Sequence, residues 1–123
     1  MFRHVKFASA PVRDQDRAVG FYRDVLGLTL VNDTPYGDDW RWIEFEIPGA
    51  ATRILFARAG AEAPGPEPAL ILVCEDVDAA HSELAARGVR FTQEPTAAPW
   101  SPQERFALFA DSEGNVVMLG SGA

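Results

Sequence analysis

The sequence contains one cysteine, Cys74, and no long run of apolar residues. A single cysteine excludes an intramolecular disulfide and any metal site built from several cysteines. No apolar run approaches the ~20 residues that a membrane-spanning helix requires, so no membrane partner is predicted. Residues 1–6 lack the apolar stretch and small-residue cleavage site of a signal peptide, and we therefore expect a cytoplasmic protein.

Positive charge is also scarce, with 11 Lys and Arg against 18 Asp and Glu and a net charge of −7. This balance argues against nucleic acids and anionic membranes as partners. No Ser-His-Asp set, phosphate-binding loop or paired-carboxylate motif is evident. The sequence does have a globular composition, because 47% of its 123 residues are apolar. We expect either a single domain over 1–123 or two fused half-domains that share a core.

An internal repeat is the most informative feature that is present. Val12–Ala18 recurs as Cys74–Ala80, 62 positions later. Arg41–Phe45 recurs as Arg105–Phe109, 64 positions later. The repeat predicts two tandem β-α-β-β-β modules, each too small to bury a core alone. The groove between such modules is the natural place for a ligand.

The first module is expected over about residues 1–57. Asp14 is a plausible N-cap for a helix that Gly27 ends. The apolar residues of this segment follow helical spacing and predict one buried face: Ala18, Phe21, Tyr22, Val25 and Leu26. Alternating or β-branched stretches predict strands at 4–12, 28–31, 41–47 and 52–57.

The second module is expected over about residues 69–123, after a linker at 58–68. The linker composition, with three prolines and two glycines, separates the two halves. The second module repeats the order of the first, with a helix at 76–87 and strands at 69–74, 89–92, 105–110 and 115–119. A proline-rich loop is expected around Trp100, and Ser112–Asn115 has the composition of a tight turn.

The helix signature Val12-x-Asp14-x-Asp16-Arg17-Ala18-x-x-Phe21-Tyr22-x-x-Val25-Leu26-Gly27-Leu28 resembles the vicinal oxygen chelate superfamily. The second half matches as well, through Asp76–Ala80, Arg87-Gly88-Val89 and Asp111-x-x-Gly114-Asn115. This superfamily includes glyoxalase I, bleomycin-resistance proteins, fosfomycin-resistance enzymes, extradiol dioxygenases and an acyl-CoA epimerase. The resemblance implies an α+β fold in which two tandem βαβββ modules form a curled mixed sheet around a shared groove. The fold hosts several unrelated chemistries, so it does not by itself identify an activity.

In enzymatic members of this superfamily, His, Glu or Gln side chains from the first and last strands of each half hold a divalent metal. The corresponding positions here are Phe7 and Ala69 in the first strands, and Ile54 and Met118 in the last. None of these side chains is a ligand for a hard or borderline cation. His4 lies three residues from Phe7 and so is expected on the opposite strand face, unless a slip or bulge intervenes. We therefore predict a groove with neither metal nor cofactor.

Strand alternation predicts which side chains line the groove. The list is mostly apolar and aromatic: Phe7, Ser9, Trp42, Glu44, Ile54, Phe56, Ala69, Ile71, Phe106, Leu108, Val116 and Met118. An apolar concave surface with a few polar groups is typical of a small-molecule site. The alternative is that these side chains are simply core. The large aromatic Trp100 falls in a loop, where we expect it to form a rim, a lid or a dimer contact.

Three charged residues are further candidates. Glu44 is expected in the groove, where partial desolvation would raise its pKa and favour a cationic or hydrogen-bond-donating ligand group. It is also the candidate catalytic residue, as a general base. Arg41 and Arg105 occupy equivalent positions, and together they would clamp an anionic ligand. The alternative we favour is that they pair with nearby carboxylates, namely those of Asp38, Asp39 or Glu104.

The function predicted from these features is metal-free binding of a small molecule, of the bleomycin-resistance type, by a homodimer. Binding would sequester an apolar or planar ligand in an aromatic groove. One alternative is a metal-dependent lyase, isomerase or dioxygenase of the same superfamily with unconventional ligands. A second is a structural or regulatory dimer that binds no ligand.

Overall fold

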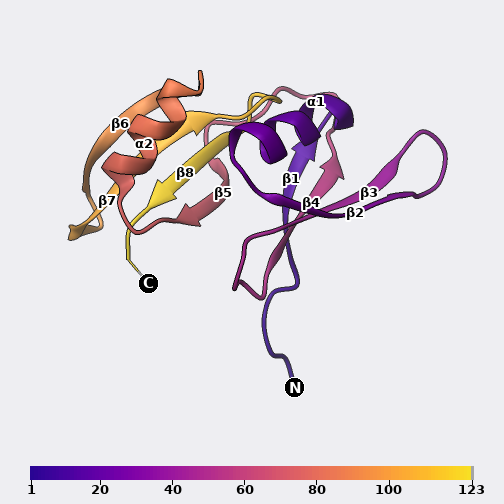
Figure 1. Cartoon of the computed structure of the whole chain (residues 1–123), viewed down its shortest axis with the longest axis horizontal. Coiled ribbons are helices and arrows are strands. Elements are labelled where there is room, and N and C mark those ends of the chain that lie inside the picture. Colours follow the sequence, from indigo (N-terminus) through magenta and orange to yellow (C-terminus); the bar gives the residue numbers. More distant parts are fainter. Residues whose placement is uncertain (123) are drawn as a thin grey trace. The chain divides into compact units, whose positions relative to one another are not determined.

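The computed structural model describes residues 1–122 as two compact units, Met1–Glu62 and a second unit that begins at Ala63. Each unit is a β-α-β-β-β module, as the sequence repeat predicts (Figure 1). The fold is therefore α+β, with two four-stranded mixed sheets that curl without closing. The shared groove stays a prediction, as does the single domain over 1–123.

The first unit begins with β1 (Phe7–Val12), α1 (Gln15–Gly20) and a short π-helix, η1 (Phe21–Val25). Three further strands follow: β2 (Thr29–Pro35), β3 (Arg41–Glu46) and β4 (Arg53–Arg58). The strand order is β1-β4-β3-β2, with β1 parallel to β4 and the other pairs antiparallel. The first strand begins at Phe7 rather than at residue 4, so residues 1–6 are free of regular secondary structure.

The second unit contains β5 (Pro68–Val73), α2 (Val77–Ala86), β6 (Arg90–Ala98), β7 (Ser101–Ala110) and β8 (Val116–Gly120). Its order, β5-β8-β7-β6, reproduces the topology of the first sheet. The loop predicted around Trp100 is only Pro99-Trp100, because β6 and β7 extend toward it as a long hairpin. The linker between β4 and β5 spans residues 59–67, close to the prediction.

The two helices begin in the same way. The Asp14 carboxylate accepts a hydrogen bond from the backbone N–H of Arg17 at 3.0 Å, and that of Asp76 accepts one from Ala79 at 3.0 Å. Each aspartate thus satisfies an N–H group that the first helical turn leaves without a partner. The helical segments lead to Gly27 and Gly88, whose φ angles of 75° and 91° favour glycine. Among residues 1–122, no helix has the length and apolar character needed to cross a membrane.

The helix of each unit packs against one face of its own sheet. In the first unit Tyr22 is fully buried, and its ring centroid lies 6.0 Å from that of Phe45 and 5.2 Å from that of Phe56. In the second unit Phe109 is fully buried, and its ring centroid lies 5.5 Å from that of Phe91, which in turn contacts His81 of α2. We call the opposite face of each sheet its helix-free face, because no helix of the same unit covers it.

The predicted positions of Ile54 and Phe56 are wrong. They were expected on the face that carries Glu44, but Ile54 pairs with Phe45 across β3 and β4, and directly opposed residues share a face. Both are 2% exposed and belong to the core beneath α1 and η1. The 64-residue offset fails here because the β3–β4 connection, residues 47–52, is one residue longer than the β7–β8 connection, residues 111–115. Leu55 takes the place that Ile54 was expected to have.

Candidate functional site

The helix-free face of the first sheet gathers most of the candidate residues of this unit. Register places Phe7 opposite Arg53, Ser9 opposite Leu55, and Glu44 opposite Leu55. Trp42, two residues from Glu44 on β3, lies on the same face. The groove residues predicted on β1 and β3 are therefore brought together, whereas Ile54 and Phe56 of β4 are not.

Three aromatic rings form a row along this face. The ring centroids of Phe7 and Trp42 are 5.9 Å apart at an interplanar angle of 76°. Those of Trp42 and Tyr36 are 5.2 Å apart at 67°. Edge-to-face contacts of this kind are favourable beyond the area they bury. Tyr36 is 62% exposed, so the row is accessible at that end.

Glu44 lies next to Trp42 on the same face and is 7% exposed, and three neighbours donate hydrogen bonds to it. Its Oε2 accepts from Trp42 Nε1 at 2.7 Å and from Asn32 Nδ2 at 3.3 Å. Its Oε1 accepts from Arg53 Nη1 at 2.9 Å. Both carboxylate oxygens are thus already engaged within the first unit.

These contacts reverse the predicted pKa shift of Glu44. Burial acts to raise the pKa, as the sequence suggested, but the hydrogen bonds from Arg53, Trp42 and Asn32 outweigh it and the pKa lies below its ordinary value. Hydrogen bonds to the charged form favour that form. Glu44 is therefore an ionised residue that holds Arg53 and the Trp42 indole in place, and its role as a cationic-ligand anchor or general base loses its physical basis.

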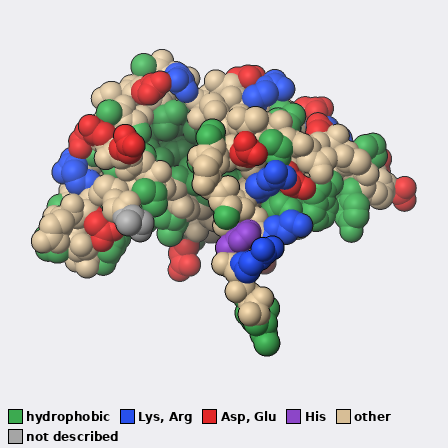
Figure 2. Space-filling view, turned by 60° about the horizontal axis from the view of Figure 1, so that its bottom comes forward, with side chains coloured by type: hydrophobic (Ala, Val, Ile, Leu, Met, Phe, Trp, Pro, Cys, Tyr) green, Lys and Arg blue, Asp and Glu red, His purple; other side chains and the backbone are tan. Residues whose placement is uncertain are grey.

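A cleft adjoins this face where the N-terminal segment meets β4. It has a volume of about 540 Å³ and is lined by Met1, Arg3, His4, Lys6, Ala51 and Arg53. The Lys6 carbonyl accepts a hydrogen bond from Arg53 N at 2.9 Å, and the Val5 carbonyl accepts one from Thr52 Oγ1 at 2.6 Å. Figure 2 shows Lys and Arg side chains around a histidine where the N-terminal segment leaves the body of its unit. Sequence reasoning missed this cleft because it treated His4 only as a possible metal ligand.

Arg41 and Arg105 are each engaged by carboxylates of their own unit. Arg41 donates to Asp16 at 2.8 Å and to Asp33 at 2.9 Å, and Arg105 donates to Asp78 at 2.7 Å. The hydrogen bonds that Arg41 donates to Asp33 and Asp16 raise its pKa, and the hydrogen bond that Arg105 donates to Asp78 raises the pKa of Arg105. The expectation that both arginines pair with carboxylates is confirmed. The partners, however, are not Asp38, Asp39 or Glu104. The true partners include Asp16 and Asp78, which are equivalent residues of the repeat.

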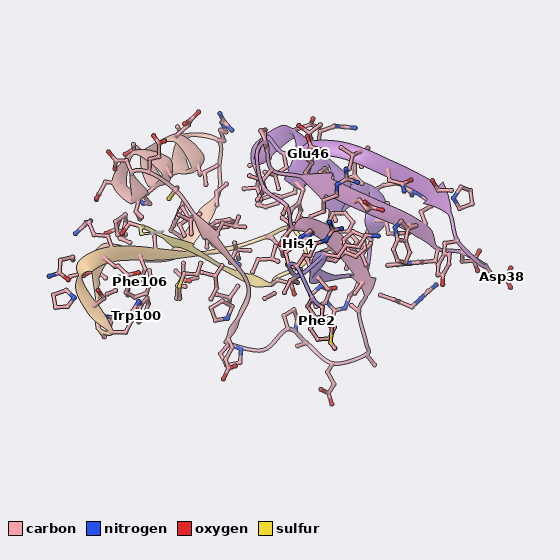
Figure 3. All side chains as sticks on the ribbon, turned by 90° about the horizontal axis from the view of Figure 1, so that it is seen from below. Phe2, His4, Asp38, Glu46, Trp100 and Phe106 are labelled. Carbon is pink, nitrogen blue, oxygen red and sulfur yellow. The ribbon has the colours of Figure 1, made fainter. Side chains whose placement is uncertain are left out.

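The second sheet places its candidate residues on its own helix-free face. Leu108 pairs with Met118, and Met118 with Ile71, so these three share a face opposite Phe109. Phe106 belongs to the same face by alternation along β7, and its ring centroid lies 5.1 Å from that of Trp100 (Figure 3). Ala69 lies at a register shift between β5 and β8. A ligand role for these residues stays a prediction.

The residues present do not fit the divalent metal of the enzymatic vicinal oxygen chelate proteins. With Leu55 in place of Ile54, the four positions hold Phe7, Leu55, Ala69 and Met118, none of which binds such a cation. Over residues 1–122, no three His, Cys, Asp or Glu side chains form a group that could hold a metal ion. His81 of α2 packs against Phe91, with ring centroids 4.5 Å apart.

Comparison with known proteins gives concordant matches over nearly the whole chain. The model of the Glyoxalase/Bleomycin resistance protein/Dioxygenase superfamily matches residues 2–119. The uncharacterized protein YetH of Bacillus subtilis (strain 168) is 28% identical over 123 residues, which is 97% of this chain and 98% of YetH.

Solved structures agree with these sequence matches. A member of the same superfamily from Sphaerobacter thermophilus DSM 20745 superposes with a TM-score of 0.85 and 30% identity, covering 98% of both chains. TnmS3, an antibiotic binding protein from Streptomyces sp. CB03234, gives a TM-score of 0.81 and 33% identity, covering 99% of this chain and 98% of TnmS3.

Proposed function

Because the chain belongs to the glyoxalase/bleomycin resistance protein/dioxygenase superfamily, we propose that it binds a small organic molecule by sequestration and without a metal. The bound molecule is planar and largely apolar, and it lies along the helix-free face of the first sheet. No covalent chemistry is part of this function.

The observation that carries the proposal is the aromatic row of Phe7, Trp42 and Tyr36. Large aromatic side chains on a sheet face are normally covered by a helix or by a second sheet, and no helix of the first unit covers this one. The Trp42 indole is fixed by its hydrogen bond to Glu44, so the ring is held in one orientation before any ligand arrives. Such preorganisation reduces the entropic cost of binding.

The relatives support a binding function. TnmS3, which is 33% identical over nearly the full length, is an antibiotic binding protein. The metal-dependent lyase, isomerase or dioxygenase remains the alternative within this superfamily. It is disfavoured by the side chains at the four metal positions, which supply no suitable donor atoms.

Assembly and location belong to the same proposal. The protein acts as a homodimer in the cytoplasm, and dimer formation covers sheet edges such as β5, where Ile71 and Val73 are 63% and 64% exposed. Cys74 is a free cysteine, which is compatible with a reducing compartment.

The binding function is tested with 2-naphthol, a neutral planar probe, by isothermal titration calorimetry and by the shift of the melting temperature. We expect saturable binding that Trp42→Leu weakens by about 1 kcal/mol or more, because an aromatic contact is lost. Trp40→Leu is the matched control, since the Trp40 ring packs against the Arg58 guanidinium at 4.5 Å and not in the row. Absence of binding to the wild-type protein, or equal losses in the two variants, would contradict the proposal.

A further inference from the structure

The cleft beside the aromatic row concentrates positive charge in a protein whose net charge is −7. Arg3, Lys6 and Arg53 line it, together with His4. Several other arginines are paired with carboxylates, as Arg41 is with Asp16 and Asp33. Among the described residues, by contrast, Arg3 and Lys6 form no ion pair and no side-chain hydrogen bond.

The cleft and the aromatic row are continuous. Lys6 Nζ lies 5.5 Å from the centroid of the Phe7 ring, which is the first ring of the row. Phe7 pairs with Arg53 between β1 and β4, and Arg53 donates a hydrogen bond to Glu44, which also accepts one from Trp42. A ligand that lies along the row with one end at Phe7 therefore places that end among the cationic side chains.

Arg53 is held in a defined position with donors to spare. Its Nη1 donates a hydrogen bond to Glu44, and its Nη2 lies 3.8 Å from Oε2 of Glu46. Its side chain is 44% exposed, so further guanidinium donors are accessible from the cleft. Because Glu44 already accepts hydrogen bonds from three donors, it is not available to bind a cationic ligand group. The positive charges of Arg53 and Lys6 repel such a group.

From this arrangement we infer that the site selects aromatic small molecules that carry an anionic group, a carboxylate or a phosphate. The rings lie along Phe7, Trp42 and Tyr36, and the anion lies in the cleft between the N-terminal segment and β4. Figure 3 shows His4 on this segment, beside the sheet of the first unit. The inference rests on the proposed function and adds the charge of the ligand to it. It also reverses the cationic preference that the sequence suggested through Glu44.

The test compares three probes with the same ring system: 2-naphthoate, 2-naphthol and the cationic 2-naphthylmethylamine. We expect affinity to fall in that order, and the affinity for naphthoate to decrease with ionic strength. The double variant Arg3→Gln/Lys6→Gln should bind naphthoate about tenfold less tightly, because charge-assisted hydrogen bonds are lost, and should bind naphthol as before. Arg90→Gln, which removes an exposed cation from β6 of the other unit, should change neither affinity.

The outcomes separate this inference from the function on which it rests. If naphthol and naphthoate bind equally well, or if the double variant retains full affinity for naphthoate, the charge preference is wrong and the binding function stands. If none of the three probes binds, the proposed function fails and the inference fails with it.

Discussion

Arg53 Nη1 donates a hydrogen bond of 2.9 Å to Oε1 of the buried Glu44, and this pair joins the aromatic row to the cationic cleft. Glu44 is 7% exposed, whereas the Arg53 side chain is 44% exposed. The carboxylate is thus the inner, structural member of the pair, and the guanidinium is the member that faces solvent and a ligand. The two residues lie on neighbouring strands, β4 and β3, so the sheet register determines their approach.

Loss of Arg53 should destabilise the fold. In Arg53→Gln the Glu44 carboxylate keeps its bonds from Trp42 and Asn32 but loses its charged partner, which should lower the free energy of unfolding by about 1–3 kcal/mol. Urea denaturation measures the change. Arg90→Gln is the control, with an expected change within about 0.5 kcal/mol, as for an ordinary surface substitution. Equal stability of the two variants would mean that the Glu44–Arg53 pair contributes nothing.

The pKa of Glu44 makes this contribution dependent on pH. Its pKa is lower in the folded protein than its ordinary value of 4.5, so ionised Glu44 stabilises the fold above that value. The contribution is lost as the pH falls through the folded pKa. The difference in the free energy of unfolding between wild type and Glu44→Gln should therefore be constant near pH 7. Below pH 4.5, wild type should lose stability relative to the variant. Denaturation curves between pH 3 and pH 7 measure it, and a wild-type advantage that grows on acidification would contradict the assigned shift.

Two adjacent substitutions test which face of β4 is buried in the core. Phe56 is 2% exposed and contacts Tyr22 and Phe45, so Phe56→Ala should lower the free energy of unfolding by about 3–5 kcal/mol. Leu55 lies on the helix-free face and is only half-buried, so Leu55→Ala should cost clearly less. Denaturant unfolding of both variants provides the comparison. If Leu55→Ala were the more damaging, β4 would have the register that the 64-residue offset suggested.

Much of the fold could be predicted from the repeat, because helix caps and strand alternation are local properties. Asp14 and Asp76 begin the helices as expected, and the faces of β3 and β7 follow from alternation alone. The face of β4 could not be obtained in this way. It depends on the length of the preceding connection, and one extra residue moves every side chain of a strand to the other face.

The chemistry of the site was harder to predict than its location. Glu44 was expected to be desolvated, and it is, but the direction of its pKa shift depends on donors from three different strands. Asn32 reaches Glu44 from β2, whose register with β3 shifts between Leu30 and Asn32. Arg53 reaches it only because of the pairing of β3 with β4. Hydrogen bonds that depend on register between strands leave no signal in a single sequence.

Metal removal should leave the protein unchanged. The side chains of Phe7, Leu55, Ala69 and Met118 supply no suitable ligand, so elemental analysis after dialysis should find zinc, nickel, iron and manganese well below one per chain. Treatment with EDTA should not shift the melting temperature. A one-to-one metal content that survives dialysis, or a lower melting temperature with EDTA, would overturn the metal-free proposal and favour the enzymatic alternative.

Dimer formation is the last expectation, and it depends on the edges of the sheets. β5 is an edge strand of the second sheet, and an edge strand leaves backbone hydrogen-bonding groups without partners. On β5, Ile71 and Val73 add exposed apolar surface to such an edge. Light scattering at micromolar concentration should therefore give twice the chain mass of 13.4 kDa. Val73→Lys, which places a charge on this edge, should shift the particle toward the monomer, whereas Arg90→Gln should not. A wild-type particle of one chain mass would contradict the dimer, and an unaffected dimer in Val73→Lys would place its interface elsewhere than on β5.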